Sequence, residues 1–143
     1  MLRWNTRSLM KVFIFMDKTT AAIEWFEYAD RDLDSAIFLQ QMKPLPLEII
    51  CFHCQQSAEK YLKGYIALNG GEIQRTHDLI LLLKICIKYC SEFEQIREEC
   101  LILTDHAVVV RYPSHSDIVI RDMEQALIAA AKIQKHVKVI SNV

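Results

Sequence analysis

Residues 46–71 read PLEIICFHCQQSAEKYLKGYIALNGG. Pro46 can open a helix at its first position, where a missing N–H has no consequence. Apolar residues then recur at spacings of three and four, the period of one helix face. They are Cys54, Ala58, Tyr61, Leu62 and Tyr65. Asn69-Gly70-Gly71 is a strong signal for a helix end and a turn. The stretch therefore predicts one long amphipathic helix.

The preceding segment, from about Ala21 to Met42, repeats this period. We expect Thr20 to cap its helix and Pro44 to end it, because a proline ring cannot continue a helix. The expected core face comprises Ile23, Phe26, Ala29, Leu33 and Ile37.

Three more helices are expected after residue 71. Thr76 is the predicted N-cap of the first, with Asp78 near the positive end of its dipole. Ser91 has capping-box spacing to Glu94 and predicts the start of the second. Ser116 is the predicted cap of the third. The expected core positions are Leu79, Leu82, Cys86 and Tyr89, then Phe93, Ile96, Cys100, Leu103 and Ala107, then Met123, Ala126, Leu127, Ala130, Ile133 and Val137.

Composition favours the same class of fold. The chain has 143 residues, 52% hydrophobic and 24% charged, which is enough for one domain with a core. Only 3 Gly and 3 Pro occur, too few for the many turns of an all-β protein. Short connections between long helices favour antiparallel neighbours. The sequence thus predicts an all-α, up-and-down bundle of about five helices.

Charge and cysteine usage narrow the setting. The net charge is -1, so contact with nucleic acid would need a local basic cluster. No run of eighteen apolar residues occurs, so we expect no membrane span. Five cysteines, an odd number, argue against a secreted disulfide scaffold and favour the cytoplasm. Residues 1–19 are expected to form a poorly ordered extension, with Met16 as the natural start, before a helical domain over residues 20–140.

Four of the cysteines form two pairs, Cys51 with Cys54 and Cys86 with Cys90. A zinc site is one interpretation of four thiols. Both pairs lie inside predicted amphipathic helices, however, and free cysteine is often buried. We therefore expect core cysteines, and neither a metal site nor a cofactor.

A polar face is predicted on the helix that follows Pro46. His53, Gln56, Lys60 and Lys63 fall at offsets of 0, 3, 7 and 10, which places them on one side. Such a stripe is normally solvated surface. Two lysines, an imidazole and an amide can also bind a phosphate or a partner's backbone, and spacing does not decide between these interpretations.

The loop before the last helix carries a second candidate site. Arg111 can stabilise a phosphate by charge, and His115 can move a proton near neutral pH. Tyr112 and Pro113 stiffen the loop between them. Metal-independent RNA cleavage would require such a pair. The alternative is an arginine bonded to helix carbonyls beside an exposed histidine.

The sequence resembles the HEPN domain family from about residue 20 to 138. The resemblance rests on WFEYADRDLDSA (residues 25–36), on HCQQSAEKYLK (residues 53–63), on THDL (residues 76–79) and on RYP (residues 111–113). It implies a helical bundle that forms a symmetric homodimer. Many members are ribonucleases, often toxins paired with an MNT-type nucleotidyltransferase, in which an Arg and a His meet across the dimer in the pattern R-x4-6-H. Here three residues separate Arg111 from His115.

The resemblance leads to three hypotheses, and whether the chain is an enzyme is left undecided. The first is a nucleotide- or RNA-associated accessory domain of the RYP-bearing subgroup. It would act as a homodimer beside a nucleotidyltransferase in a toxin–antitoxin-like module. Arg111 and Tyr112 would contact phosphate there, together with His53, Gln56, Lys60 and Lys63. The second is a metal-independent endoribonuclease that uses Arg111 and His115. The third is a helical protein-interaction module without a ligand.

Overall fold

The computed structural model describes residues 5–106 and 117–143, with residues 12–16 described only by their place in a helix. Five α-helices and one 3-10 helix make up the described part of the chain. The helical bundle predicted from periodicity and composition is confirmed. None of the described helices is both long and apolar enough to cross a membrane.

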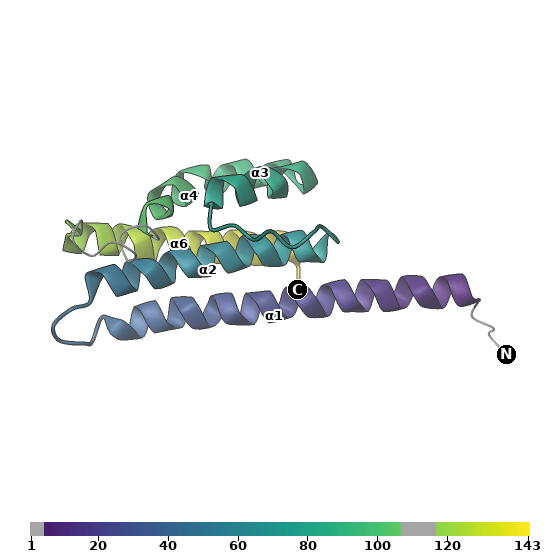
Figure 1. The fold of residues 1–143 in the computed structure, drawn as a ribbon, viewed down its shortest axis with the longest axis horizontal. Coiled ribbons are helices and arrows are strands. Elements are labelled where there is room, and N and C mark those ends of the chain that lie inside the picture. The colour runs from purple at the N-terminus through teal and green to yellow at the C-terminus, as the bar shows by residue number, and fades with distance from the viewer. Residues whose placement is uncertain (1–4, 107–116) are drawn as a thin grey trace.

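Helix α1 (Thr6–Leu39) begins far earlier than predicted. Thr20, the expected cap, lies inside the helix. The observed N-cap is Asn5, whose Oδ1 accepts a 2.7 Å hydrogen bond from the Ser8 backbone N–H. No Gly or Pro occurs between these two positions to interrupt the helix. The first part of α1 therefore extends beyond the other helices (Figure 1).

Helix α2 (Leu47–Leu68) lies at the centre of the bundle. It packs against α1 on one side and against α3 (Leu79–Tyr89) and α6 (Ile120–Ser141) on the other (Figure 1). Pro46 was predicted to be the first residue of this helix and is instead its N-cap, one position before the helix begins. Gly70 follows the helix in the turn, with a φ of 73°. All five predicted core residues of α2 are buried.

Two of the predicted caps differ in the structure. Asp78, not Thr76, caps α3: its Oδ1 accepts from the backbone N–H groups of Ile80 and Leu81 at 3.0 and 3.2 Å. Thr76 instead accepts from the Asp78 backbone N–H, which fixes the chain just before the helix. The helix expected from Ser91 is a 3-10 segment, η1 (Ser91–Ile96), followed by α4 (Arg97–Thr104). The predicted cap Ser116 and core residue Ala107 lie outside the described residues.

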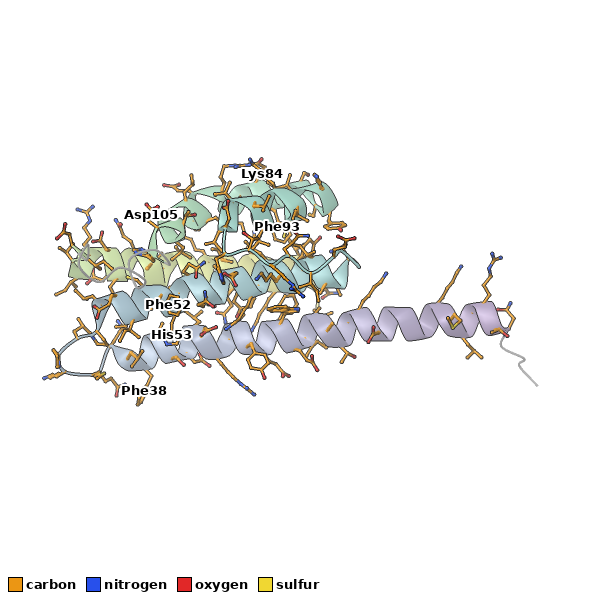
Figure 2. All side chains as sticks on the ribbon, in the orientation of Figure 1. Phe38, Phe52, His53, Lys84, Phe93 and Asp105 are labelled. Atoms are coloured by element: carbon orange, nitrogen blue, oxygen red, sulfur yellow. The ribbon has the colours of Figure 1, made fainter. Side chains whose placement is uncertain are left out.

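The helices form three layers: α3 and α4 in the upper layer, α2 and α6 in the middle layer, and α1 in the lower layer (Figure 1). The core lies between these layers. Phe93 of η1 is fully buried, 4.4 Å from the ring centre of Tyr65 in α2 and 5.4 Å from that of His136 in α6. Figure 2 shows Phe93 between the upper and middle layers, whereas Phe38 points outward from α1. Burial of such aromatic side chains is the main stabilising term for a bundle of this size.

Some predicted core residues are exposed. Ile23 and Ile37 of α1 are 41% and 52% exposed, and Tyr89 of α3 is 43% exposed. Ala22 and Ala36 take the core positions on α1 in place of the two isoleucines. Phe26, Ala29 and Leu33 are buried as predicted, so the core face of α1 differs from the predicted stripe only at its two ends.

Candidate functional site

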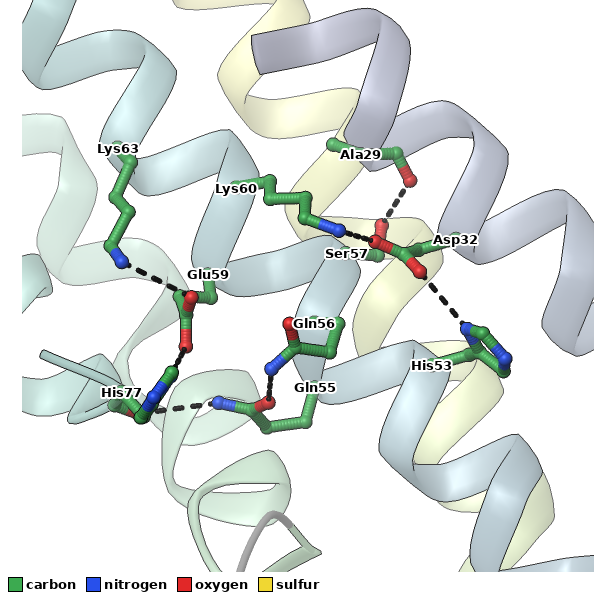
Figure 3. A network of polar contacts seen from close by, with 10 residues as sticks. All are labelled: Ala29, Asp32, His53, Gln55, Gln56, Ser57, Glu59, Lys60, Lys63 and His77. Carbon is green, nitrogen blue, oxygen red and sulfur yellow. Dashed lines mark hydrogen bonds and ion pairs between the residues drawn. The ribbon is translucent and has the colours of Figure 1, made fainter.

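The polar face of α2 is turned toward α1, where Asp32 receives two of its side chains. His53 Nδ1 lies 2.9 Å from Asp32 Oδ1, and the Lys60 ammonium donates to Asp32 Oδ2 (Figure 3). The Asp32 side chain is only 13% exposed. A carboxylate in this position needs the paired cation, because a buried charge without a partner is costly.

Glu59 forms the second centre of this network. Its side chain is 5% exposed and contacts Lys63 Nζ at 3.2 Å and His77 Nδ1 at 2.8 Å (Figure 3). Gln55 donates to the His77 backbone carbonyl at 3.2 Å, and Gln56 donates to the Gln55 side-chain oxygen at 2.8 Å. These contacts hold the segment before α3 against α2.

The four predicted residues of α2 therefore do not converge on one open anion site. His53 and Lys60 pair with Asp32, Lys63 pairs with Glu59, and Gln56 pairs with its neighbour. Their shared face is partly buried between α1 and the segment before α3. A ligand at this face would compete with two carboxylates, and the binding role of these residues stays a prediction.

The second predicted site lies outside the described residues. Arg111, Tyr112, Pro113 and His115 all fall in the stretch 107–116. Their roles in phosphate binding or catalysis therefore also stay predictions.

The structure reveals three further candidates on α1 that the sequence analysis did not single out. Trp25, Tyr28 and Arg31 follow one another at intervals of three, so they turn from the edge of α1 beside α2 toward its exposed outer surface. The Arg31 guanidinium carbon lies 5.1 Å from the centre of the Tyr28 ring, and Lys63 Nζ lies 5.9 Å from that of Trp25. We call these three residues the α1 strip. Their spacing was visible in the sequence, but it becomes informative only once the neighbouring groove is known.

An open groove of about 490 Å³ adjoins the α1 strip. Trp25 and Tyr28 of α1, Lys60 of α2 and Ile73 of the segment before α3 line it, together with Ala21 and Glu24. Tyr28 is 56% exposed. Arg31 is exposed and forms no ion pair with any residue in the described part of the chain. The groove thus offers two aromatic side chains, and Arg31 lies on the outer side of one of them, Tyr28.

The cysteines are core residues, as predicted. Cys51, Cys54, Cys86 and Cys100 are buried and Cys90 is half-buried, all as free thiols. Burial raises the pKa of Cys54 and Cys100 to about 12 and that of Cys51 to about 11. Such thiols stay protonated and unreactive at neutral pH. Among residues 5–106 and 117–143, no group of three or more His, Cys, Asp or Glu side chains is placed to hold a metal ion.

Comparison with known proteins places this geometry in a family. The crystal structure of an archaeal HEPN homologue matches with a TM-score of 0.64 and 24% sequence identity. The match covers 84% of this chain and 97% of the homologue, which shows a shared fold. No match was found among curated proteins. A model of the HEPN domain family matches residues 22–140, from within α1 almost to the end of α6, and the chain belongs to this family.

Proposed function

We propose that this HEPN domain is a nucleotide- or RNA-binding accessory domain that contacts single-stranded RNA along the α1 strip. One observation carries the proposal: Trp25 and Tyr28 line an open groove together with Lys60, and the Arg31 guanidinium lies against the Tyr28 ring. Aromatic side chains interleaved with cations are the usual surface for single-stranded nucleic acid.

The chemistry of the strip favours base stacking over dense phosphate contact. Base–aromatic stacking contributes about 1–3 kcal/mol per base. Lys60 is paired with Asp32, and Glu24 also lines the groove, so the groove itself has little net positive charge. Arg31 is the cation best placed to meet a phosphate beside a base stacked on Tyr28, because its guanidinium carbon lies 5.1 Å from the centre of that ring. We expect moderate affinity and weak sequence preference.

The loop and the assembly complete the proposal. Arg111 and Tyr112 would supply the principal phosphate contact. The chain would act as a homodimer, which brings a second copy of each surface into the complex. A nucleotidyltransferase is the proposed protein partner, in a module like those of HEPN toxins. Family membership supports these points. Sedimentation analysis alone and after co-expression with the partner would test them.

Fluorescence anisotropy of a labelled single-stranded oligoribonucleotide tests RNA binding. We expect Tyr28→Ala and Arg31→Ala each to weaken binding by about tenfold, because each removes a stacking or charge contact. Two matched controls lie away from the strip: Phe38→Ala, an exposed aromatic on the same helix, and Lys84→Ala, an exposed lysine on α3. Both controls should bind as the parent does. Equal RNA affinity of Tyr28→Ala and Phe38→Ala would contradict RNA binding along the α1 strip.

The fate of the RNA separates this proposal from the two other hypotheses. We expect the oligoribonucleotide to be bound and to stay intact on a denaturing gel. Cleavage by the parent that is lost in both Arg111→Ala and His115→Ala would favour the endoribonuclease. Absence of RNA and nucleotide binding at millimolar concentration would favour the plain protein-interaction module.

A further inference from the structure

A second groove, of about 450 Å³, lies between η1, α4 and α6. It shares no residue with the groove beside the α1 strip. Its wall includes Glu99 of α4 and four residues on one face of α6 at offsets of 0, 3, 4 and 7. These are Lys132, Lys135, His136 and Val139. The volume is in the range of small-molecule sites and far above the roughly 30 Å³ that one water occupies.

Two acceptor atoms in this groove lack partners. Glu99 Oε2 and His136 Nε2 are buried, and neither has a hydrogen-bond partner among the described residues. The Glu99 side chain is 13% exposed, and its other oxygen lies 3.6 Å from Lys132 Nζ. Buried polar atoms without partners are uncommon in proteins, since each costs the free energy of its lost hydration. Their presence in one groove indicates a place for a hydrogen-bond donor from outside the chain.

The protonation state of His136 makes its free nitrogen an acceptor. Burial lowers the pKa of His136 by more than the nearby Glu92 and Glu99 raise it, so the ring is neutral at pH 7. The Glu92 backbone acts to raise this pKa, but less than burial lowers it. Nε2 is unpaired, and it is an acceptor in the neutral tautomer that carries its proton on Nδ1. In that tautomer Nε2 carries a lone pair that no described residue uses.

The other residues of the groove indicate the charge and polarity of the rest of the ligand. Lys132 and Lys135 are exposed and place two positive charges at its edge. The groove also has an apolar wall, to which Ile96 of η1 and Val139 of α6 contribute, and Val139 is 71% exposed. An apolar part of a ligand can therefore pack against this wall. A purely cationic ligand would be repelled by the lysines, and a purely anionic one would leave the two acceptors unpaired.

We propose that the α4–α6 groove binds a small molecule that carries an amine donor at one end and an anionic group at the other. The amine would donate to Glu99 and His136, and the anionic group would meet Lys132 and Lys135. Two sources fit this chemistry: a nucleoside monophosphate whose base has an exocyclic amine, or a free amino acid. The site is independent of RNA binding at the α1 strip.

Isothermal titration with matched probes tests the site in the full chain. AMP and IMP differ where the base carries an amine in one and an oxygen in the other, as do CMP and UMP. Leucine tests the amino-acid source. We expect one amine-bearing probe to bind, and if it is a nucleotide, its oxo counterpart should bind at least about tenfold more weakly. Because a base can also stack on Tyr28, the titrations are repeated in Tyr28→Ala, and the binding that persists in this variant belongs to the α4–α6 groove.

Two variants assign the contacts. Glu99→Gln should lower the affinity for the amine-bearing nucleotide to about that for its oxo counterpart. Lys135→Ala should weaken binding of the nucleotide by about fivefold, because one charge contact is lost. Lys84→Ala is the control for a lost surface charge. Equal affinity for both members of each nucleotide pair, or no binding of AMP, CMP or leucine at about 10 mM, would overturn the proposal. The comparison of probes on the parent chain stands even if Glu99→Gln fails to fold.

Discussion

At the scale of single residues, Tyr61 and three other polar side chains form a cluster that joins three helices. Tyr61 of α2 is fully buried and donates to Asp30 of α1. The Gln134 amide of α6 lies 2.8 Å from the Tyr61 oxygen and 3.0 Å from Asp30 Oδ1, and Lys138 Nζ lies 3.0 Å from Asp30 Oδ2. Burial acts to raise the pKa of Asp30, but the hydrogen bonds from Tyr61, Lys138 and Gln134 outweigh it and lower the pKa. The cluster ties α1, α2 and α6 together.

Removing one hydroxyl tests this cluster. Tyr61→Phe should lower the free energy of unfolding by about 1–2 kcal/mol, because Asp30 and Gln134 lose a buried partner. Tyr28→Phe is the matched control, since Tyr28 is exposed and makes no hydrogen bond in the described part of the chain. Urea denaturation followed by circular dichroism measures both. Equal effects of the two substitutions would contradict a stabilising role of the Tyr61 hydroxyl.

The burial of two histidines, His106 and His136, predicts how the free energy of unfolding depends on pH. Burial lowers the pKa of His106 and of His136, by more than neighbouring carboxylates raise it. The unfolded chain then takes up protons at a higher pH than the folded one. Stability from these groups is complete above the ordinary pKa of 6.5 and is lost as the pH falls below it.

Urea denaturation at several pH values between about 7.5 and 5 measures this dependence. We expect the free energy of unfolding to fall as the pH is lowered. The fall should be shallower in His136→Phe, which removes one of the two groups and keeps a ring against Phe93. An equal or steeper fall in His136→Phe would show that this ring does not stay neutral in the folded protein.

Which single residues are buried could be predicted only in part. Burial follows the helical period closely on α2, which has neighbours on several sides. On α1 the period alone favoured Ile23 and Ile37, yet Ala22 and Ala36 are buried. The reason is that α1 packs closely on α2, and a close approach of two helices favours small side chains. Periodicity reports apolar residues but not the distance to the next helix.

At the scale of helices, Gly64 controls how closely α1 approaches α2. A Cβ added at Gly64 would lie 2.6 and 2.8 Å from two atoms of the Phe26 ring and 2.9 Å from Trp25 Cβ. These distances are too short for an undisturbed contact. The absence of a side chain at Gly64 thus allows Phe26 to enter the core and fixes Trp25 beside the groove.

Gly64→Ala tests this close contact. In an open helix the change would stabilise by up to about 1 kcal/mol, because Ala favours helix over Gly. We expect destabilisation of about 1–3 kcal/mol, since the new methyl group overpacks the interface. The melting temperature and urea denaturation measure the change. The sign of the effect decides whether helix propensity or overpacking of the α1–α2 interface is the larger contribution. A stabilised variant would show that α1 can move away without cost.

Helix boundaries were harder to predict than the helices themselves. Thr20 and Asn5 both have side chains suited to N-caps, and only the folded chain shows that the helix continues past Thr20 to Asn5. Thr76 and Asp78 posed the same ambiguity two residues apart, and both take part in the turn before α3. Local capping preferences are similar in strength, so tertiary contacts decide between neighbouring candidates.

At the scale of the whole molecule, the sequence predicted the bundle but not the contacts of its polar face. Lys60 and Asp32 are 28 positions apart, and their pairing depends on how α1 lies against α2. The offsets on α2 predicted that His53, Gln56, Lys60 and Lys63 share one side, but they could not show that His53 and Lys60 meet Asp32 of α1. The α1 strip likewise became a candidate only when the groove beside it was known.

Quenching of Trp25 fluorescence tests the central claim most directly, because Trp25 lies in the proposed RNA-binding strip. Trp25 and Trp4 are the two tryptophans of the chain, so Trp4→Phe leaves Trp25 as the single reporter. We expect a single-stranded oligoribonucleotide to quench this fluorescence saturably, with an affinity that falls as salt is raised. The quench should weaken about tenfold in Tyr28→Ala and persist in Phe38→Ala. Unchanged fluorescence at RNA concentrations where anisotropy shows binding would mean that RNA contacts another surface and would contradict the proposal.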